Sequence, residues 1–161
     1  MIGSISKEIQ VNVPSIKAWE LYSSQALAKI TEEKLKNVIE KLKTEGDGGV
    51  GTIVEIVFTP GGAQGFRSYK EKFTKIDHEK RVKETEVIEG GYLDLGFNLF
   101  RVRFEIIDKE EGTSCITRST IEYDVKEEFE DNASFVNIEP LVMLMQAAAD
   151  ILLIAKANGH N

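Results

Sequence analysis

Three side chains that could take part in acid–base chemistry lie on two adjacent segments of the chain. The segment GFRSYKEKFTKID (residues 65–77) carries Tyr69, Glu71 and Phe73 at alternate positions. Alternate residues of a β-strand share one face, and a face that carries Tyr and Phe is expected to point inward. We therefore expect Glu71 to lie in apolar surroundings beside the two aromatic rings.

The next segment, RVKETEVIEG (residues 81–90), places Lys83 on one face with Thr85. A hairpin between the two segments could bring Lys83 near Glu71. Desolvation would raise the pKa of the carboxyl group and lower that of the amino group, while their mutual attraction opposes both shifts. Such a pair is suited to general acid–base catalysis. The alternative is a partly buried ion pair without function, or surface charges on a strand that faces the other way.

The elements that must position these groups begin with a strand. ISKEIQVNV (residues 5–13) alternates apolar and polar side chains, which is typical of a half-buried strand. Pro14 is expected to end it, and Ser15 is expected to cap a short helix. A second short helix is predicted through residues 27–35.

Strand signals then follow one another closely. They are bounded by turn-forming sequences such as GDGG, PGGAQG and KEEGTS. Short connections of this kind join antiparallel strands, because parallel strands need long crossovers. The predicted strands cover roughly residues 38–45, 51–58, 66–75, 81–89, 97–107 and 114–125.

The chain ends in a long run of helix formers, IEPLVMLMQAAADILLIAKANG, which starts at Ile138. Asn137 is a plausible cap, and Pro140 falls in the first turn, where proline is tolerated. The run is apolar almost all round. We interpret it as a helix buried against a curved sheet. A membrane span is the weaker alternative, because the apolar core is short and Asp150 interrupts it.

The stretch EGDGGVGT (residues 45–52) contains a complete G-x-G-x-x-G motif, formed by Gly46, Gly48 and Gly51. A dinucleotide-binding motif needs a helix directly after the glycines, because the helix N-terminus receives the pyrophosphate. Here the β-branched sequence TIVEIVF follows instead. We predict a hairpin loop in which the glycines supply positive φ angles.

Composition narrows the function classes further. The 161 residues, with 27 acidic and 20 basic side chains, fit a single domain over 1–161 that does not bind nucleic acid. The lone Cys115 excludes an internal disulfide and favours a reducing compartment. The N-terminal sequence lacks the apolar core of a secretory signal, so we expect a cytoplasmic protein. His78 and His160 are too few and too far apart for a metal site.

The order of one strand, two short helices, six strands and a long C-terminal helix resembles the plant pathogenesis-related class ten proteins, the family of the major birch-pollen allergen. EGDGGVGT matches that family's glycine-rich loop, and VIEGGYLDLG and STIEY fall where the family has similar segments. The resemblance covers the whole chain. It implies an α+β fold in which a seven-stranded antiparallel curved sheet wraps around the long helix, with a hydrophobic cavity between them.

Within this family, SYKEKF and IEGGYLDLG resemble the norcoclaurine synthase branch, and the chain is also similar to norbelladine synthases. The resemblance implies a cofactor-free Pictet–Spengler condensation of an arylethylamine of the dopamine type with an aromatic aldehyde. The branch's catalytic Tyr, Glu and Lys correspond to Tyr69, Glu71 and Lys83. Its Asp near the cavity mouth falls at Val102 here, a departure that bears on how the amine is bound.

Phe73, Val102 and Met143 are the residues expected to contact a ligand. Met143 fits an adaptable cavity wall on the long helix, although ordinary core packing explains a methionine there equally well. The same fold and loop would also serve a non-catalytic carrier of hydrophobic plant metabolites such as alkaloids, flavonoids or hormones. Val102 favours the carrier, whereas the set of Tyr69, Glu71 and Lys83 favours catalysis.

In both hypotheses the partner is a small molecule, either an aromatic amine with an aldehyde or a hydrophobic plant metabolite. We expect no membrane partner, and a monomer or a weak dimer. A ribonuclease activity, which is sometimes proposed for the family, is disfavoured by the acidic charge balance.

Overall fold

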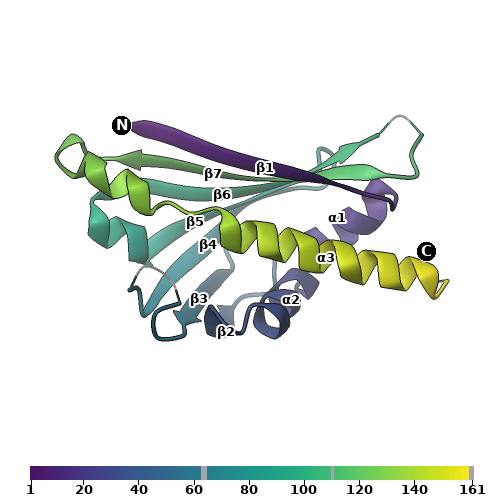
Figure 1. Cartoon of the computed structure of the whole chain (residues 1–161), viewed down its shortest axis with the longest axis horizontal. Helices are drawn as coiled ribbons and strands as arrows, with labels where there is room; N and C mark the ends of the chain where they lie inside the picture. The colour runs from purple at the N-terminus through teal and green to yellow at the C-terminus, as the bar shows by residue number, and fades with distance from the viewer. Residues whose placement is uncertain (63–64, 110, 160–161) are drawn as a thin grey trace.

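The computed structural model describes residues 1–62, 65–109 and 111–159. Figure 1 shows its elements along the chain. In chain order they are β1 (Ile2–Val11), α1 (Ser15–Ser23), α2 (Ala26–Lys34), β2 (Ile39–Glu45), β3 (Ile53–Phe58), β4 (Ser68–Asp77), β5 (Val82–Gly90), the 3₁₀ helix η1 (Gly91–Leu95), β6 (Phe97–Asp108), β7 (Cys115–Val125), the 3₁₀ segment η2 (Glu127–Phe135) and α3 (Glu139–Ala157).

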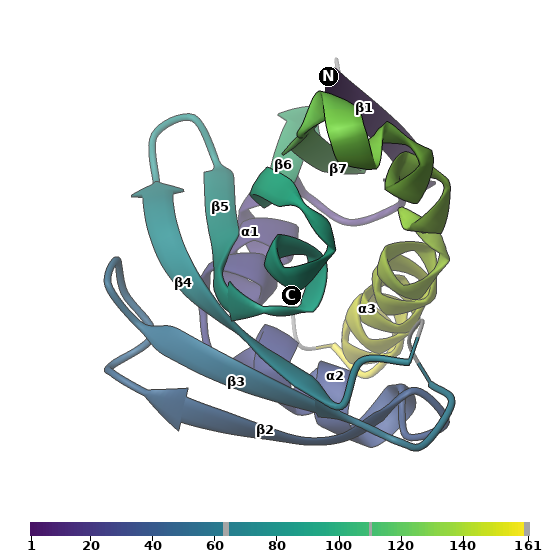
Figure 2. The same cartoon turned by 90° about the vertical axis from the view of Figure 1, so that its left-hand side faces the viewer.

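The seven strands form one antiparallel sheet in the order β1-β7-β6-β5-β4-β3-β2. The sheet is strongly curved, and α3 closes its open side (Figure 2). The α3 helix contacts α1, α2, β1 and β7. The predicted fold class is therefore confirmed, including the two short helices after the first strand. From β2 to β7, each strand begins and ends within two residues of its predicted bounds.

The start of α1 differs from the prediction. Pro14 ends the preceding extended segment and occupies the N-cap position, while Ser15 is the first helical residue and makes no capping hydrogen bond. The hydroxyl of Ser15 instead donates to the carboxylate of Asp108 at the end of β6. Ser15 lies one position after the N-cap, so its side chain does not cap the helix. The hydroxyl group donates to a charged acceptor, a strong hydrogen bond that ties α1 to the sheet.

The start of α3 differs from the prediction by one residue, because Ile138 occupies the N-cap position without a side-chain capping bond and Asn137 precedes it. Oδ1 of Asn137 accepts a hydrogen bond of 3.0 Å from the backbone N–H of Glu139, the first residue of the helix. Pro140 follows within the first turn, where no intrahelical N–H donor is lost. By length and composition α3 could cross a membrane, with a mean hydropathy of 1.6. In this fold, however, its inner face packs into the core through Leu144 and Ala148.

The glycine-rich loop is a hairpin connection between β2 and β3, as predicted. Gly46, Gly48 and Gly51 have φ angles of 129°, 93° and 96°, a region that side-chain-bearing residues rarely adopt. Thr52 closes the loop, because its Oγ1 accepts a 2.9 Å hydrogen bond from the N–H of Gly48. A strand follows the loop, so the helix that a dinucleotide site requires does not follow the glycines.

Candidate active site

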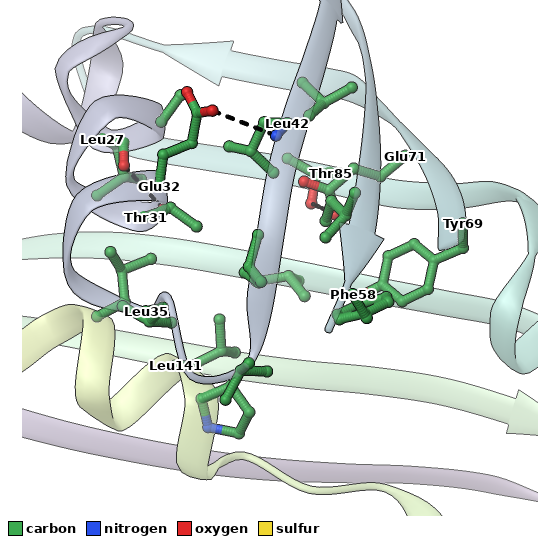
Figure 3. Close-up of a pocket in the computed structure, with 18 of the residues that line it drawn as sticks. Leu27, Thr31, Glu32, Leu35, Leu42, Phe58, Tyr69, Glu71, Thr85 and Leu141 are labelled. Atoms are coloured by element: carbon green, nitrogen blue, oxygen red, sulfur yellow. Dashed lines mark hydrogen bonds between the residues drawn. The ribbon is translucent and has the colours of Figure 1, made fainter. Parts of the chain in front are cut away.

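A cavity of about 710 Å³ lies between the curved sheet, α2 and the start of α3. Figure 3 shows part of its wall, where Leu27 and Thr31 of α2, and Leu35 directly after the helix, face side chains from the sheet. Its wall is mostly apolar, and its volume suits one or two small aromatic molecules. The lining residues of the sheet are Ile39, Leu42, Thr44, Val54, Ile56, Phe58, Tyr69, Glu71, Phe73, Lys83, Thr85, Phe100, Val102, Phe104 and Ile121.

Tyr69 stands on β4 with its side chain in this wall. Its ring packs against Phe58 with ring centroids 5.1 Å apart (Figure 3), and against Phe66 in a T-shaped arrangement at 6.2 Å. A Cβ atom at Gly91 would come within 2.6 Å of the Tyr69 ring, so the glycine at this position makes room for the aromatic side chain. Burial raises the pKa of the Tyr69 hydroxyl well above its ordinary value, and the charge of Glu71 adds to the shift. The phenol is therefore neutral at physiological pH.

Glu71, two residues further along β4, points to the same side. Its β-sheet neighbours are Val54 on β3 and Val87 on β5, so the backbone places it between apolar positions. Oε2 of Glu71 accepts a hydrogen bond of 3.4 Å from Oγ1 of Thr85 (Figure 3). Desolvation raises the pKa of the Glu71 carboxyl to about 7, although the charge of Lys83 and the bond from Thr85 both act in the opposite direction.

Lys83 on β5 is only 3% exposed. Its ammonium group donates a 3.2 Å hydrogen bond to the backbone carbonyl of Tyr22, in the last turn of α1. Nζ also lies 4.2 Å from the centroid of the Phe73 ring, a cation–π distance. Desolvation lowers the pKa of the Lys83 amino group to about 8, and the charge of Glu71 opposes this shift.

The strand register keeps the carboxyl and amino groups apart. Glu71 is opposite Val87, which lies four residues along β5 from Lys83, and Lys83 is opposite Ile76, beyond a one-residue register shift between Phe73 and Lys75. Among the described ion pairs none joins Glu71 to Lys83. The predicted inward face of both strands and the predicted direction of both pKa shifts are confirmed. The cavity thus holds a proton acceptor and a proton donor that face the same space.

The three predicted ligand contacts differ in outcome. Phe73 and Val102 both line the cavity, and Val102 pairs with Thr85 across β5 and β6. The described lining residues of α3 are Pro140, Leu141 and Leu144. Met143 is partly exposed and is not among them, so its predicted place on the cavity wall is corrected. Each helical residue turns by about 100°, and the turn that directs Leu144 inward leaves Met143 to the side.

Two contributions to the site were not predicted from the sequence. The sequence contained an indication of the hydrogen bond from Thr85 to Glu71, because Thr85 shares a strand face with Lys83. It contained no indication of the contact with the Tyr22 carbonyl, since every residue has a carbonyl group and α1 is distant along the chain. At the rim of the cavity, Oε2 of Glu32 on α2 accepts a 3.4 Å hydrogen bond from the N–H of Leu42 (Figure 3).

Within residues 1–62, 65–109 and 111–159, no group of three or more His, Cys, Asp or Glu side chains is placed to hold a metal ion. His160 lies outside these described residues. Nδ1 of His78 accepts a 3.1 Å hydrogen bond from the indole N–H of Trp19, and the two rings meet edge to face. His78 therefore has a structural partner on α1.

Comparison with known proteins agrees with this geometry. The sequence is 44% identical to norbelladine synthase of Narcissus pseudonarcissus over 98% of this chain and 96% of that protein. It is 40% identical to S-norcoclaurine synthase 2 of Papaver somniferum over 92% of this chain, and the match spans 64% of that longer protein. The structure of norcoclaurine synthase from Thalictrum flavum in complex with dopamine and hydroxybenzaldehyde superposes with a TM-score of 0.86 at 36% identity, covering 95% of this chain and 87% of that one.

The match to a family extends over residues 1–155, which include the glycine-rich loop, every strand and nearly all of α3. The chain belongs to the Pathogenesis-related protein Bet v 1 family.

Proposed function

We propose that the protein condenses an arylethylamine of the dopamine or tyramine type with an aromatic aldehyde by Pictet–Spengler chemistry, with Lys83 and Glu71 as acid and base. One observation carries the proposal: a carboxyl group with a pKa of about 7 and an amino group with a pKa of about 8 face one largely apolar cavity. The similarity to norbelladine and norcoclaurine synthases supports this choice of reaction.

The reaction begins when the amine nitrogen attacks the aldehyde carbon. Lys83 donates a hydrogen bond and then a proton to the carbonyl oxygen, the nitrogen gives one of its protons to the resulting hydroxyl group, and water leaves to give an iminium ion. A ring carbon of the arylethylamine attacks the iminium carbon, and Glu71 removes the ring proton to restore aromaticity. The aldehyde carbon is already electrophilic, so these steps use only the side chains of the cavity.

The cavity contributes by holding both reactants together. Fixing two molecules in a productive geometry removes much of the entropic barrier of a bimolecular step. Tyr69, packed on Phe58 and Phe66, forms a rigid aromatic wall beside Glu71. Among the described lining residues the carboxylates are Glu32 and Glu71, so with Val102 in the wall these two are the anions available to a protonated amine.

Product formation from dopamine and 4-hydroxyphenylacetaldehyde tests the proposal. We expect Lys83→Met and Glu71→Gln to lower kcat/KM by about 10²–10⁴, the usual contribution of a general acid or base. Lys72→Met is a matched control, because Lys72 is exposed on the other face of β4. Equal rates for all four proteins, or no rate above buffer, would reject the proposal.

A carrier of hydrophobic plant metabolites is the second candidate, and the apolar Val102 in the cavity wall favours it. A carrier should bind an apolar fluorescent ligand with the same affinity in the wild type and in the Glu71→Gln, Lys83→Met double variant, and should show no condensation. An enzyme should lose turnover in the double variant. These opposite outcomes separate the two functions.

We also propose that the protein works in the cytoplasm as a monomer or a weak dimer. The single cysteine, Cys115, is a free thiol, which supports a reducing compartment. Size-exclusion chromatography with light scattering over a range of concentrations tests the oligomeric state, and a stable higher oligomer would contradict it.

A further inference from the structure

The amino group of Lys83 has the environment of a nucleophile as well as that of an acid. Nζ lies on the cavity wall, and its hydrogen bond to the Tyr22 carbonyl uses one N–H. The Phe73 ring covers another side. A carboxylate in direct contact would hold Nζ as an ammonium ion, but no ion pair among the described residues joins Lys83 to Glu71, whose sheet partner Val87 lies four residues along β5.

We propose that Lys83 forms a Schiff base with aldehydes that enter the cavity in the absence of an amine substrate. This is a covalent activity separate from the condensation, in which Lys83 only donates a proton. The choice of an aryl aldehyde as ligand rests on the proposed function. The reactivity of Lys83 is inferred from the geometry of the cavity.

The groups around Lys83 suit this chemistry. Glu71 and Tyr69 on β4 share the cavity with it, and Tyr22 of α1 contributes a carbonyl acceptor and a neutral, buried hydroxyl. Phe104 on β6 and Ile76 on β4 flank Lys83 in the sheet and carry no charge. The lowered pKa of the amino group means that a substantial fraction is unprotonated near pH 8, whereas an exposed lysine with a pKa of about 10.4 is almost fully protonated there.

The reaction balances within the cavity. Unprotonated Nζ attacks the aldehyde carbon, the C–N bond forms as the C=O π bond breaks, and one of the two nitrogen protons passes to the oxygen, which becomes a hydroxyl group. Water in the cavity carries the second nitrogen proton to the hydroxyl group, which leaves as water as the C=N bond forms. Water that enters later hydrolyses the imine and restores the lysine, so the adduct is reversible. An external hydride donor reduces the C=N bond to a stable secondary amine.

The experiment uses the full chain, 4-hydroxyphenylacetaldehyde without any amine, and sodium cyanoborohydride at pH 8, followed by intact mass and peptide mapping. The modified protein should gain the mass of the aldehyde less one oxygen atom. We expect the peptide that contains Lys83 to be labelled at least about tenfold faster than peptides with exposed lysines. Labelling spread over the exposed lysines, with Lys83 unmodified, would overturn the proposal.

Two variants sharpen the test. Lys83→Arg keeps a cation at the same place but lacks a nucleophilic amine, so its fast adduct should disappear. Lys72→Arg is the matched control on the exposed face of β4 and should keep the fast adduct. If Lys83→Arg fails to fold, as judged by circular dichroism, the wild-type peptide map alone decides.

Condensation assays on the same protein separate this inference from the proposed function. Condensation without an adduct on Lys83 overturns the inference and leaves the enzyme assignment intact. An adduct without condensation supports the inference and rejects the assignment.

Discussion

Glu71 and Lys83 face one cavity from adjacent strands, yet no ion pair among the described residues joins them, because Val87, the sheet partner of Glu71, lies four residues along β5 from Lys83. For each group, the cost of desolvating its charged form therefore exceeds the stabilisation that the opposite charge provides. The pKa of Glu71 rises to about 7 and that of Lys83 falls to about 8, so their proton affinities nearly converge. Between these values the base is ionised and the acid is protonated, which is the combination that the condensation needs.

The first prediction is a bell-shaped dependence of kcat/KM on pH. Activity should rise as Glu71 ionises at about pH 7 and fall as Lys83 deprotonates at about pH 8, with a narrow optimum between the two. Initial rates between pH 5 and 10 measure it, after correction for the uncatalysed reaction. A rate that increases steadily with pH would show that the titration of Lys83 does not limit the reaction.

The second prediction concerns the hydroxyl of Thr85. Its hydrogen bond stabilises the ionised form of Glu71 and so lowers the carboxyl pKa. Thr85→Val keeps the shape and removes the bond, which should move the acidic limb of the pH–rate profile upward by about 0.4–1 unit, the equivalent of a net hydrogen bond of about 0.5–1.5 kcal/mol.

Thr74→Val is the control for Thr85→Val. Thr74 donates a hydrogen bond to the carbonyl of Glu84, so replacing it by valine removes a similar hydroxyl group without affecting Glu71. An acidic limb that moves equally in both variants would mean that the shift reports general loosening of the sheet.

Much of the fold follows from local patterns. Alternation in residues 65–77 and 81–90 put Tyr69, Glu71 and Lys83 on the inner face, and the short turns required antiparallel pairing. Such patterns are local and survive in the fold because one side of each strand is buried. The two 3₁₀ segments at 91–95 and 127–135 were not predicted, since their sequences carry turn-type residues without a helical apolar period.

The site was harder to predict than the fold for a physical reason. The residue types and faces of Glu71 and Lys83 follow from sequence, but the pairing register of their strands, including a shift between residues 73 and 75, has no clear sequence signal. The contact from the Tyr22 carbonyl depends on where α1 packs against the sheet. Met143 was misplaced because an almost wholly apolar helix does not reveal which of its faces turns inward.

The third prediction addresses Val102. Val102→Asp should introduce an anion beside Thr85 on the cavity wall and lower KM for a protonated arylethylamine by about tenfold, within the range of a hydrogen bond to a charged group. It should also destabilise the unliganded protein by about 1–3 kcal/mol, because a polar group replaces a partly buried apolar one. Steady-state kinetics and urea unfolding measure the two effects.

Val102→Asn separates charge from polarity at this position. It has nearly the same size as Asp and should destabilise the protein to a similar extent, but without lowering KM. Equal KM values for the Asp and Asn variants would contradict the idea that position 102 sets amine affinity by charge.

The fourth prediction is that Cys115 is unreactive in the folded protein. The side chain is completely buried, and burial raises the pKa of its thiol to about 11, with a further contribution from the charge of Asp108. Since the thiolate is the reactive form, a disulfide reagent at pH 8 should modify Cys115 more than about a hundredfold more slowly than it does in denaturant. Rapid labelling of the native protein would indicate that β7 opens readily at its first residue.

The last prediction links the site to stability. The pKa of Glu71 is about 7 in the folded protein and near its ordinary value of 4.5 in the unfolded chain. Between these pH values the folded state binds more protons, so its stability falls as pH rises. For Lys83, the folded pKa of about 8 lies below the ordinary 10.5, so between pH 8 and 10.5 the unfolded chain binds more protons and stability increases with pH. The pair therefore destabilises the protein most between about pH 7 and 8.

Glu71→Gln isolates the acidic half of this effect. The free energy of unfolding of this variant, minus that of the wild type, should increase by about 3 kcal/mol between pH 4.5 and 7, at about 1.4 kcal/mol per pKa unit. Urea denaturation at several pH values measures this difference. The contributions of the other carboxylates to the pH dependence are the same in both proteins and cancel. In an apolar cavity the ionised form of a carboxyl group is unfavourable, and this cost is what raises the pKa of Glu71. A stability difference that stays constant with pH would mean that Glu71 is well solvated and that its pKa is not raised for proton transfer.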